Sequence, residues 1–398
     1  MNILVTSFDL EPQFIAGDKR VTLTLSKEWM KLGHKVLILC YRGNSSFHEP
    51  SVEGVDQVFL PSVTLFSNEN IKYLRQLIKE RNLNILLHQH VMEDDFNRLC
   101  ASVKDSIKIV SVLHFDVLHE EKILKQDFFI QYRNNRQIKK YLIDTVRFIK
   151  YQLKDRVALH KKIADRYRFI YDMSDCVSLL SERMIANFAS YLLVDVPRQV
   201  IGINNPAVIS DMHEPALISQ KEKIVVWCGR LSYGEKRLDR MLRIWKKISD
   251  KCSDWKLCVL GSGDLAYWQT MIQKRNIKHV ELLGFVNPSK YYQKASVLCM
   301  TSTSEGFPMV LIEAQSYACV PMAFNSFSSL QDIITDGENG LVIPKFDEDQ
   351  YARRLTVLLK QTDYREQLAI NALSSVKRFR AENIAGQWIQ VFEKLLMQ

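Results

Sequence analysis

The sequence predicts an α/β protein built from two doubly wound, Rossmann-like domains. Short apolar runs alternate with amphipathic stretches through most of the 398 residues, a pattern typical of parallel sheets covered by helices on both faces. The alternation starts twice, once at residue 1 and again near residue 220. The chain is also too long for one ordinary core, so two domains of about 200 residues each are expected.

The expected strands are apolar runs between turn signals. In the first half they cover residues 2–6, 35–40, 84–88, 107–113 and 176–180. In the second half they cover residues 223–228, 256–260, 279–283, 296–300 and 319–323.

Helical periodicity lies between these runs. Val21, Leu25 and Trp29 recur at helical spacing, and Gly33 suits the position just after the end of a helix. The final stretch, AENIAGQWIQVFEKLLMQ, places Ile384 and Trp388 on one apolar helical face, which we expect to dock on the protein. Residues 196–223 hold three prolines and read as the connection between the domains.

Composition favours a cytoplasmic globular protein. Hydrophobic residues make up 47% and charged residues 25% of the chain. No apolar run approaches the roughly 20 residues that span a bilayer, and the N-terminus enters a strand-like run without a leader pattern. The eight cysteines show no Cys-x-x-Cys spacing, so reduced, buried thiols are expected rather than zinc or redox sites.

The net charge of +9 is concentrated in one segment. From Lys122 to Arg168 we count fourteen lysines and arginines against four aspartates. Residues 121–170 are therefore expected to form a basic, amphipathic helical insertion in the first domain. Such an insertion either covers the sheet edge or binds an anionic lipid or acceptor surface. Nucleic acid is not expected, since no nucleic-acid-binding motif accompanies the charge.

Candidate ligand-binding residues follow the strands of the second half. Arg230 and Lys236 lie six positions apart after strand 223–228, where a planar cation and a point charge suit a diphosphate. Gly261 and Gly263 follow the next strand and permit close backbone approach, and Phe285 could line an aromatic base. Ordinary surface turns and a packed loop are the structural alternatives.

The stretch SEGFPMVLIEAQSY places two carboxylates around a helix start. Pro308 suits the first position of a helix over 308–318, whose free N–H groups favour an anion. Glu305 and Gly306 lie just before this helix, and Glu313 lies on its second turn. Both glutamates could reach the hydroxyl groups of a ligand, although Glu305 could instead cap the helix.

These motifs carry a family resemblance. The order GRL…EKR, LGSGD, LLGFV, SEGFPMVLIEA and VPMAFN resembles the donor domain of glycosyltransferase family 4. That family comprises retaining enzymes with the GT-B fold, in which two Rossmann-like domains face each other across a cleft. The resemblance is strong over about 223–343 and looser before residue 200. It implies a metal-independent hexosyl-type transferase that needs no cofactor and moves a sugar from a nucleotide-diphosphate sugar to an acceptor hydroxyl.

The resemblance also assigns roles to residues. Glu305 would contact the transferred sugar and Glu313 the nucleotide ribose, while Arg230 and Lys236 would neutralise the diphosphate. Backbone amides after the first glutamate would hold the phosphates, but Pro308 has no N–H to offer. The amide candidates are Phe307, Met309 and Val310.

The first half matches the family less closely. Relatives carry a Gly-Gly pair after the first strand, whereas this chain has Ala16 and Gly17. His114 matches a histidine that approaches the donor sugar in many relatives, with a surface histidine as the alternative. His88 and His90 share a strand face without a carboxylate to complete a metal site.

The implied organisation is an acceptor-side domain over residues 1–205 and a donor-binding domain over 206–380. A helix over 381–398 would cross back onto the first domain. The basic insertion suggests an anionic or lipid-linked acceptor, a glycan or lipid-linked glycan as in surface-polysaccharide assembly, at the cytoplasmic face of the inner membrane. Two other functions stay open: an epimerase or hydrolase of nucleotide sugars, and a non-catalytic membrane-binding scaffold.

Overall fold

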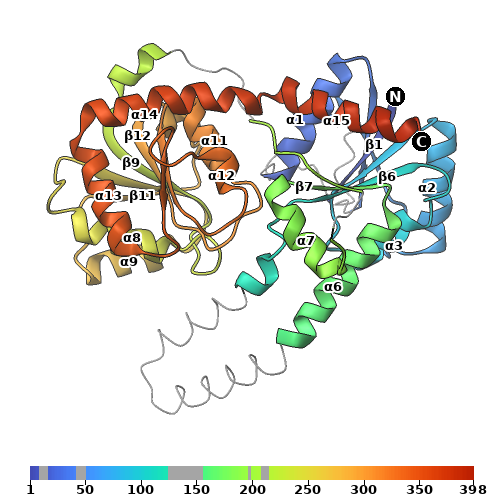
Figure 1. The fold of residues 1–398 in the computed structure, drawn as a ribbon, viewed down its shortest axis with the longest axis horizontal. Helices are drawn as coiled ribbons and strands as arrows, with labels where there is room; N and C mark the ends of the chain where they lie inside the picture. The colour runs from blue at the N-terminus through green and yellow to red at the C-terminus, as the bar shows by residue number, and fades with distance from the viewer. Residues whose placement is uncertain (9–16, 42–50, 124–155, 196–198, 208–214) are drawn as a thin grey trace. The chain divides into compact units, whose positions relative to one another are not determined.

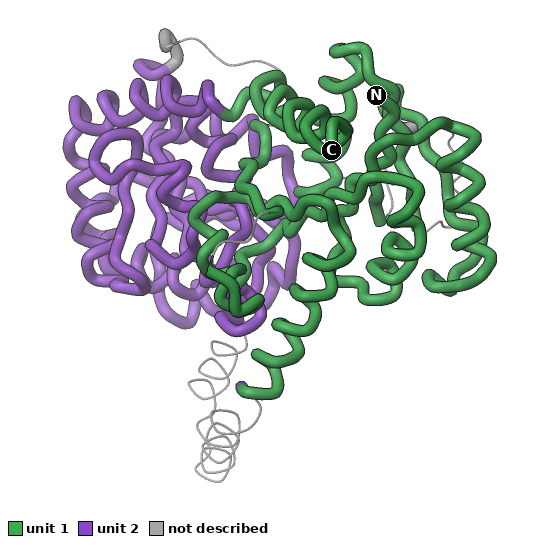
Figure 2. Tube along the Cα trace, turned by 45° about the vertical axis from the view of Figure 1, so that its right-hand side comes forward, with its two compact units in different colours: residues 1–117, 157–208, 379–398 green, residues 118–156, 209–378 purple. Residues whose placement is uncertain are grey.

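Parallel strands form the centre of both halves of the protein (Figure 1). The computed structural model describes residues 1–8, 17–41, 51–123, 156–195, 199–207 and 215–398. The chain divides into two units (Figure 2). Unit 1 comprises residues 1–117, 157–208 and 379–398, and unit 2 comprises residues 118–156 and 209–378. Each unit is an α/β structure with one sheet, which confirms the predicted fold class.

The described residues of unit 1 form an eight-stranded sheet in the order β3-β4-β2-β1-β5-β6-β7-β8. Every pairing is parallel except that of β3 with β4. The strands are β1 (Asn2–Ser7), β2 (Lys35–Cys40), β3 (Ser51–Val52), β4 (Val55–Phe59), β5 (Ile85–His88), β6 (Lys108–Leu113), β7 (Cys176–Leu179) and β8 (Val200–Gly202). The helices are α1 (Asp18–Lys31), α2 (Asn68–Glu80), α3 (Asp94–Ala101), α6 (Arg156–Met173), η3 (Glu182–Met184), α7 (Ile185–Leu192) and α15 (Ala381–Leu396).

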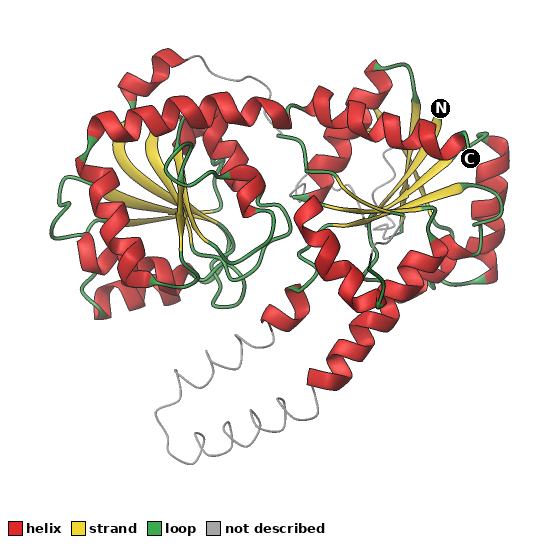
Figure 3. Ribbon diagram, in the orientation of Figure 1, coloured by secondary structure: helices red, strands yellow, loops and turns green. Residues whose placement is uncertain are grey.

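Unit 2 has a parallel six-stranded sheet in the order β11-β10-β9-β12-β13-β14 within its described residues. The strands are β9 (Glu222–Cys228), β10 (Lys256–Leu260), β11 (Val280–Gly284), β12 (Ala295–Met300), β13 (Val320–Phe324) and β14 (Leu341–Ile343). The helices are η4 (Pro215–Gln220), α8 (Leu238–Ile248), α9 (Leu265–Lys274), α10 (Ser289–Lys294), α11 (Met309–Ser316), α12 (Leu330–Ile333), α13 (Glu348–Lys360), α14 (Thr362–Ser375) and η5 (Val376–Phe379). Figure 3 shows helices on both sides of each sheet.

Burial explains why the apolar runs predicted strands well. β12 and β13 are buried along their whole length, as strands of a sheet covered on both faces must be. All ten predicted strands are confirmed to within one residue at either end. All eight cysteines are free thiols, as expected, and all but Cys228 are buried.

Four strands in the described part of the chain were not predicted. β3 and β4 form a short hairpin whose turn residues, Glu53 and Gly54, both have positive φ. β8 lies inside the stretch that was expected to be an irregular connection, and β14 is only three residues long. Such short edge strands lack the long apolar run that identifies a buried one.

The C-terminal helix α15 packs within unit 1. Its Ile384, Trp388 and Phe392 are buried, as its periodicity predicted. Trp29 of α1 donates its indole N–H to the Ala385 carbonyl oxygen at 3.3 Å, and its ring meets Phe392 at a centroid distance of 5.6 Å. The contact joins the first helix of the unit to the last.

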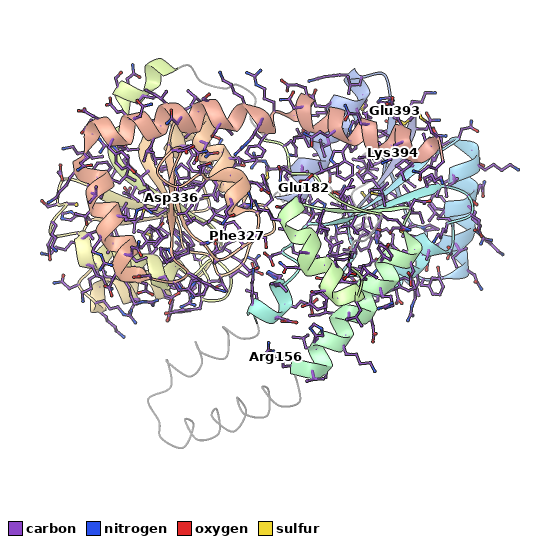
Figure 4. The ribbon with its side chains drawn as sticks, viewed as in Figure 1. Arg156, Glu182, Phe327, Asp336, Glu393 and Lys394 are labelled. Carbon is purple, nitrogen blue, oxygen red and sulfur yellow. The ribbon has the colours of Figure 1, made fainter. Side chains whose placement is uncertain are left out.

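The basic segment is described only at its ends. Residues 124–155 of the predicted insertion lie outside the described residues. Its last part is α6, which begins at Arg156 (labelled in Figure 4) and buries Ile163 and Tyr167. No helix within the described residues is long and apolar enough to cross a membrane.

Strand order locates the point where ligands bind in such sheets. In unit 2, β9 pairs with β10 on one side and with β12 on the other, so the direction of winding reverses between β9 and β12. Ligands of open α/β sheets bind outside the carboxyl ends of the strands at this reversal. The loops after Cys228 and Met300 lie at this reversal.

Candidate active site

The loops that follow β9 and β12 are held together by hydrogen bonds. The Thr303 N–H donates to the Glu235 carbonyl oxygen at 2.7 Å. The Thr301 hydroxyl lies 3.2 Å from the Lys236 carbonyl oxygen and 3.0 Å from that of Arg237, and receives the Trp227 indole N–H at 3.0 Å. The strand ends thus form one connected structure.

Lys236 and Glu305 are in direct contact within this structure. The ammonium lies 2.7 Å from one carboxylate oxygen and 2.8 Å from the other. The Lys236 side chain is 25% exposed and that of Glu305 is 11% exposed. Their sequence separation of 69 residues gave no sign of the contact. The two short contacts hold the ammonium and the carboxylate in a fixed relative orientation.

Arg230 differs from Lys236 in its exposure. Its side chain is 70% exposed, and its guanidinium approaches a Glu235 carboxylate oxygen at 3.8 Å, beyond hydrogen-bonding distance. A hydrogen bond from His119 lowers the pKa of Glu235 despite the opposing effect of burial, and the cations of Lys236 and Arg230 lower it further. The loop therefore carries two cations beside one fully ionised carboxylate.

The glycines after β10 let that loop pass close to its neighbour. Gly261 has φ of +146°, and a Cβ there would lie 1.8 Å from the Gly229 carbonyl oxygen. A Cβ on Gly263 would lie 2.6 Å from that of Leu231. Gly261 and Gly263 thus pack against Gly229 and Leu231, the residues on either side of Arg230. Direct donor binding by these glycines stays a prediction.

The helix predicted after Glu305 is α11, which begins at Met309 and has Pro308 at its N-cap. No side-chain hydrogen bond caps it within the described residues, so Glu305 does not cap it. Phe307 is 5% exposed, while Met309 and Val310 are partly exposed in the first turn. The partial positive charge at this end of the helix lies beside Gly306, directly after Glu305.

Glu313 and Phe285 have contrasting surroundings. Glu313 is 5% exposed, which is unusual for a carboxylate. Glu313 also affects a neighbouring tyrosine, Tyr292. Burial is the largest cause that raises the pKa of Tyr292 well above its ordinary value, and the neighbouring Cys228 and Glu313 raise it further. Phe285, directly after β11, is 81% exposed, so its ring is available to a planar ligand and does not pack in the core.

Gly17 and His114 belong to unit 1. Gly17 is the N-cap residue of α1 and has φ of +54° with ψ of −115°, a conformation that favours glycine. Ala16 lies outside the described residues. His114 donates from Nε2 to the Gln89 side-chain oxygen at 2.7 Å. Its Nδ1 is buried and without a hydrogen-bond partner among the described residues.

Two neighbouring histidines, His88 and His90, differ in their bonding. His88 donates from Nε2 to the Asn97 side-chain oxygen at 2.7 Å, and burial lowers its pKa to about 4. His90 lies 3.7 Å from the Asp18 carboxylate. No group of three or more metal-ligating side chains occurs in the described part of the chain.

Sequence reasoning missed Glu235, Ser304 and His119. Each lies next to or near a residue that was singled out, but only the fold shows that they touch. His119 lies 3.4 Å from Glu235 and 3.2 Å from the Ser304 hydroxyl. No spacing rule could have found contacts between segments more than 100 residues apart.

Known proteins share features with both the sequence and the fold. Residues 208–375 match the family model described as glycosyl transferases group 1. A Campylobacter jejuni α-1,4-N-acetyl-D-galactosaminyltransferase, which acts on an undecaprenol-diphosphate-linked glycan, is 26% identical over 57% of this chain and 62% of its own length. The chain therefore spans less than two thirds of that relative. An uncharacterized glycosyltransferase of Haemophilus influenzae is 22% identical over 94% of this chain and 95% of its own.

Solved structures extend the likeness to the whole fold. TarM superposes with a TM-score of 0.72 at 13% identity and covers 98% of both chains. HepE of Anabaena, solved with UDP and glucose, superposes with a TM-score of 0.68 at 15% identity and covers 99% of this chain and all of its own. Residues 208–375 therefore resemble the group 1 glycosyl transferases, and the chain as a whole has the GT-B fold.

Proposed function

We propose that the protein is a retaining glycosyltransferase that moves a hexosyl unit from a nucleotide-diphosphate sugar to an acceptor hydroxyl. One observation carries the proposal: Lys236, Glu305 and the uncapped start of α11 meet at the strand reversal of unit 2, with Arg230 exposed beside them. This combination supplies positive charge for a diphosphate and a carboxylate for sugar hydroxyls.

In the proposed reaction the acceptor oxygen attacks the anomeric carbon from the face that the diphosphate leaves. The new carbon–oxygen bond forms as the bond to the diphosphate breaks, and the departing phosphate oxygen keeps the electron pair. The acceptor proton passes to that phosphate oxygen. Arg230, Lys236 and the first amides of α11 stabilise the developing charge without a metal ion.

The remaining candidates hold the donor in place. Glu305 orients the transferred sugar while Lys236 binds the diphosphate beside it. Glu313, which is 5% exposed, binds the ribose, the role that the family resemblance gives it. Phe285 lies against the base. His114 and Gly17 of unit 1 stay predicted donor-side residues on the family resemblance alone.

The acceptor is proposed to be a glycan or a lipid-linked glycan of surface-polysaccharide assembly. Relatives support this class, among them the amylovoran biosynthesis glycosyltransferase of Erwinia amylovora, 32% identical over 43% of this chain and 48% of its own. The undecaprenol-linked substrate in the name of the Campylobacter enzyme agrees with it. We place the reaction at the cytoplasmic face of the inner membrane.

Helix α6 is the described part of the proposed membrane-binding segment. Lys161, Lys162 and Arg168 are exposed on it, as are the apolar Val157 and Phe169. Basic side chains beside exposed apolar ones suit an anionic lipid surface. Replacing Lys161 and Lys162 with serine should weaken binding to phosphatidylglycerol vesicles. The matched control replaces the exposed Lys246 and Lys247 of α8, and equal binding by both variants would contradict the proposal.

The decisive experiment incubates the protein with labelled nucleotide sugars, with and without glycan acceptors. Acceptor-dependent transfer with an unchanged anomeric configuration is expected. Sugar release or epimerisation without an acceptor would favour a hydrolase or epimerase instead. Failure to bind any nucleotide sugar would favour a non-catalytic scaffold.

A further inference from the structure

A short segment that follows the first part of unit 1 in the sequence contacts the donor loops of unit 2. Residues 118–123 follow β6 in sequence but belong to unit 2. Lys122 donates to the Ser326 carbonyl oxygen at 3.1 Å. His119 approaches the Ser304 hydroxyl through Nδ1 at 3.2 Å and a Glu235 carboxylate oxygen through Nε2 at 3.4 Å. One imidazole thus touches both loops of the candidate site.

The two contacts fix the orientation of the ring. A carboxylate only accepts hydrogen bonds, so the hydrogen on Nε2 is directed to Glu235. The Ser304 hydroxyl can donate or accept and therefore satisfies Nδ1 in either protonation state. His119 is 26% exposed and Glu235 is 35% exposed, so water competes with these bonds only in part.

Glu235 also faces Arg230, through its second oxygen. The separation of 3.8 Å is too long for a hydrogen bond. Arginine and carboxylate groups ordinarily form short, bidentate pairs when nothing prevents it. A Glu235 side chain without another partner would therefore compete with an incoming diphosphate for the same guanidinium.

We infer that His119 is a positioning residue that holds Glu235 away from Arg230 and so keeps the guanidinium open to the diphosphate. The inference rests on the proposed function, in which Arg230 binds that group. The hydrogen bond from His119 is the largest of the effects that lower the pKa of Glu235, ahead of the charges of Lys236 and Arg230. The geometry agrees, since His119 lies 3.4 Å from this carboxylate and Arg230 lies 3.8 Å from it.

The test measures the affinity for UDP, GDP and ADP by titration calorimetry, and then the donor KM and kcat. His119→Ala should weaken binding of the preferred nucleotide by roughly fivefold to tenfold, because Glu235 then pairs with Arg230. The donor KM should rise more than kcat falls. His119→Gln, whose amide can still reach Glu235, should retain most of the affinity.

The double variant separates positioning from simple structural support. His119→Ala with Glu235→Gln should restore binding, since the competing carboxylate is gone. A double variant as weak as His119→Ala alone would overturn the inference, as would unchanged binding in His119→Ala.

Comparison with Lys236→Ala keeps the two proposals distinguishable. If Lys236→Ala loses affinity while His119→Ala does not, the inference fails and the proposed function stands. If the unmodified protein binds none of the three nucleotides, both fail. Thermal unfolding of each variant shows whether a loss reflects misfolding.

Discussion

Replacing Lys236 with alanine should lower kcat/KM for the donor by at least tenfold. The ammonium makes two bonds of 2.7 and 2.8 Å to Glu305, and its side chain is three-quarters shielded from water. A hydrogen bond that involves a charged group contributes about 1.5–3 kcal/mol, which corresponds to a loss of roughly 10-fold to 150-fold. The loss combines a missing cation for the diphosphate with an unpaired carboxylate at Glu305.

Steady-state kinetics over a range of donor concentrations measures this loss. Lys236→Arg keeps the positive charge but replaces the compact ammonium with a planar guanidinium, so its kcat/KM should fall less than that of Lys236→Ala. Lys247→Ala is the matched control, because this lysine forms an exposed pair with Asp349 and such pairs contribute little. If Lys236→Ala kept the kcat/KM of the unmodified protein, neither its contact with Glu305 nor its cation would matter to the reaction.

Three further predictions concern stability and are measured by urea unfolding. Gly261→Ala should destabilise the protein by on the order of 3 kcal/mol or more, since the new Cβ meets the Gly229 carbonyl. Gly17→Ala is the control: it has open space around it and should cost only about 1 kcal/mol of backbone strain. Equal losses of stability in the two variants would contradict the steric argument. Asp239→Asn should cost about 3–5 kcal/mol of unfolding free energy at pH 7, because burial raises the pKa of Asp239 but hydrogen bonds and charges from arginines lower it by more. The stability that Asp239 contributes is present above the unfolded pKa of about 3.9 and is lost as the pH falls through the lower folded pKa. A difference between the variant and the unmodified protein that persisted in acid would refute this. Burial lowers the pKa of His88 from 6.5 to about 4, so the unfolded chain takes up a proton first and stability should fall by about 3 kcal/mol as the pH drops from 6.5 to 4; His88→Gln should flatten that slope.

The sequence predicted the elements that depend on local pattern. The buried strands β12 and β13 are continuous apolar runs, and α11 starts one residue after Pro308, which was expected at its first position and lies at its N-cap. β3 and β8 were not predicted, because a short edge strand needs no such run. In each case the pattern reflected how completely the element is buried.

The candidate site was predicted in its residue types more than in its contacts. Arg230, Lys236 and Glu305 follow strand ends, which the order of strands brings to one edge of the sheet. Their separation along the chain does not reveal that Lys236 bonds to Glu305. The contacts of His119 depend on the path of the chain after β6, which no local pattern encodes.

The packing of α15 against α1 has a consequence for synthesis. Unit 1 takes its last helix from residues 379–398, so all of unit 2 is synthesised before unit 1 is complete. Until then the indole of Trp29 has no α15 carbonyl to bond and no Phe392 ring to meet. Domains generally fold as they emerge, so unit 2 can finish first although unit 1 begins the chain. A fragment that stopped at residue 208 would leave that apolar surface bare, and supplying the C-terminal helix as a separate peptide should restore its fold.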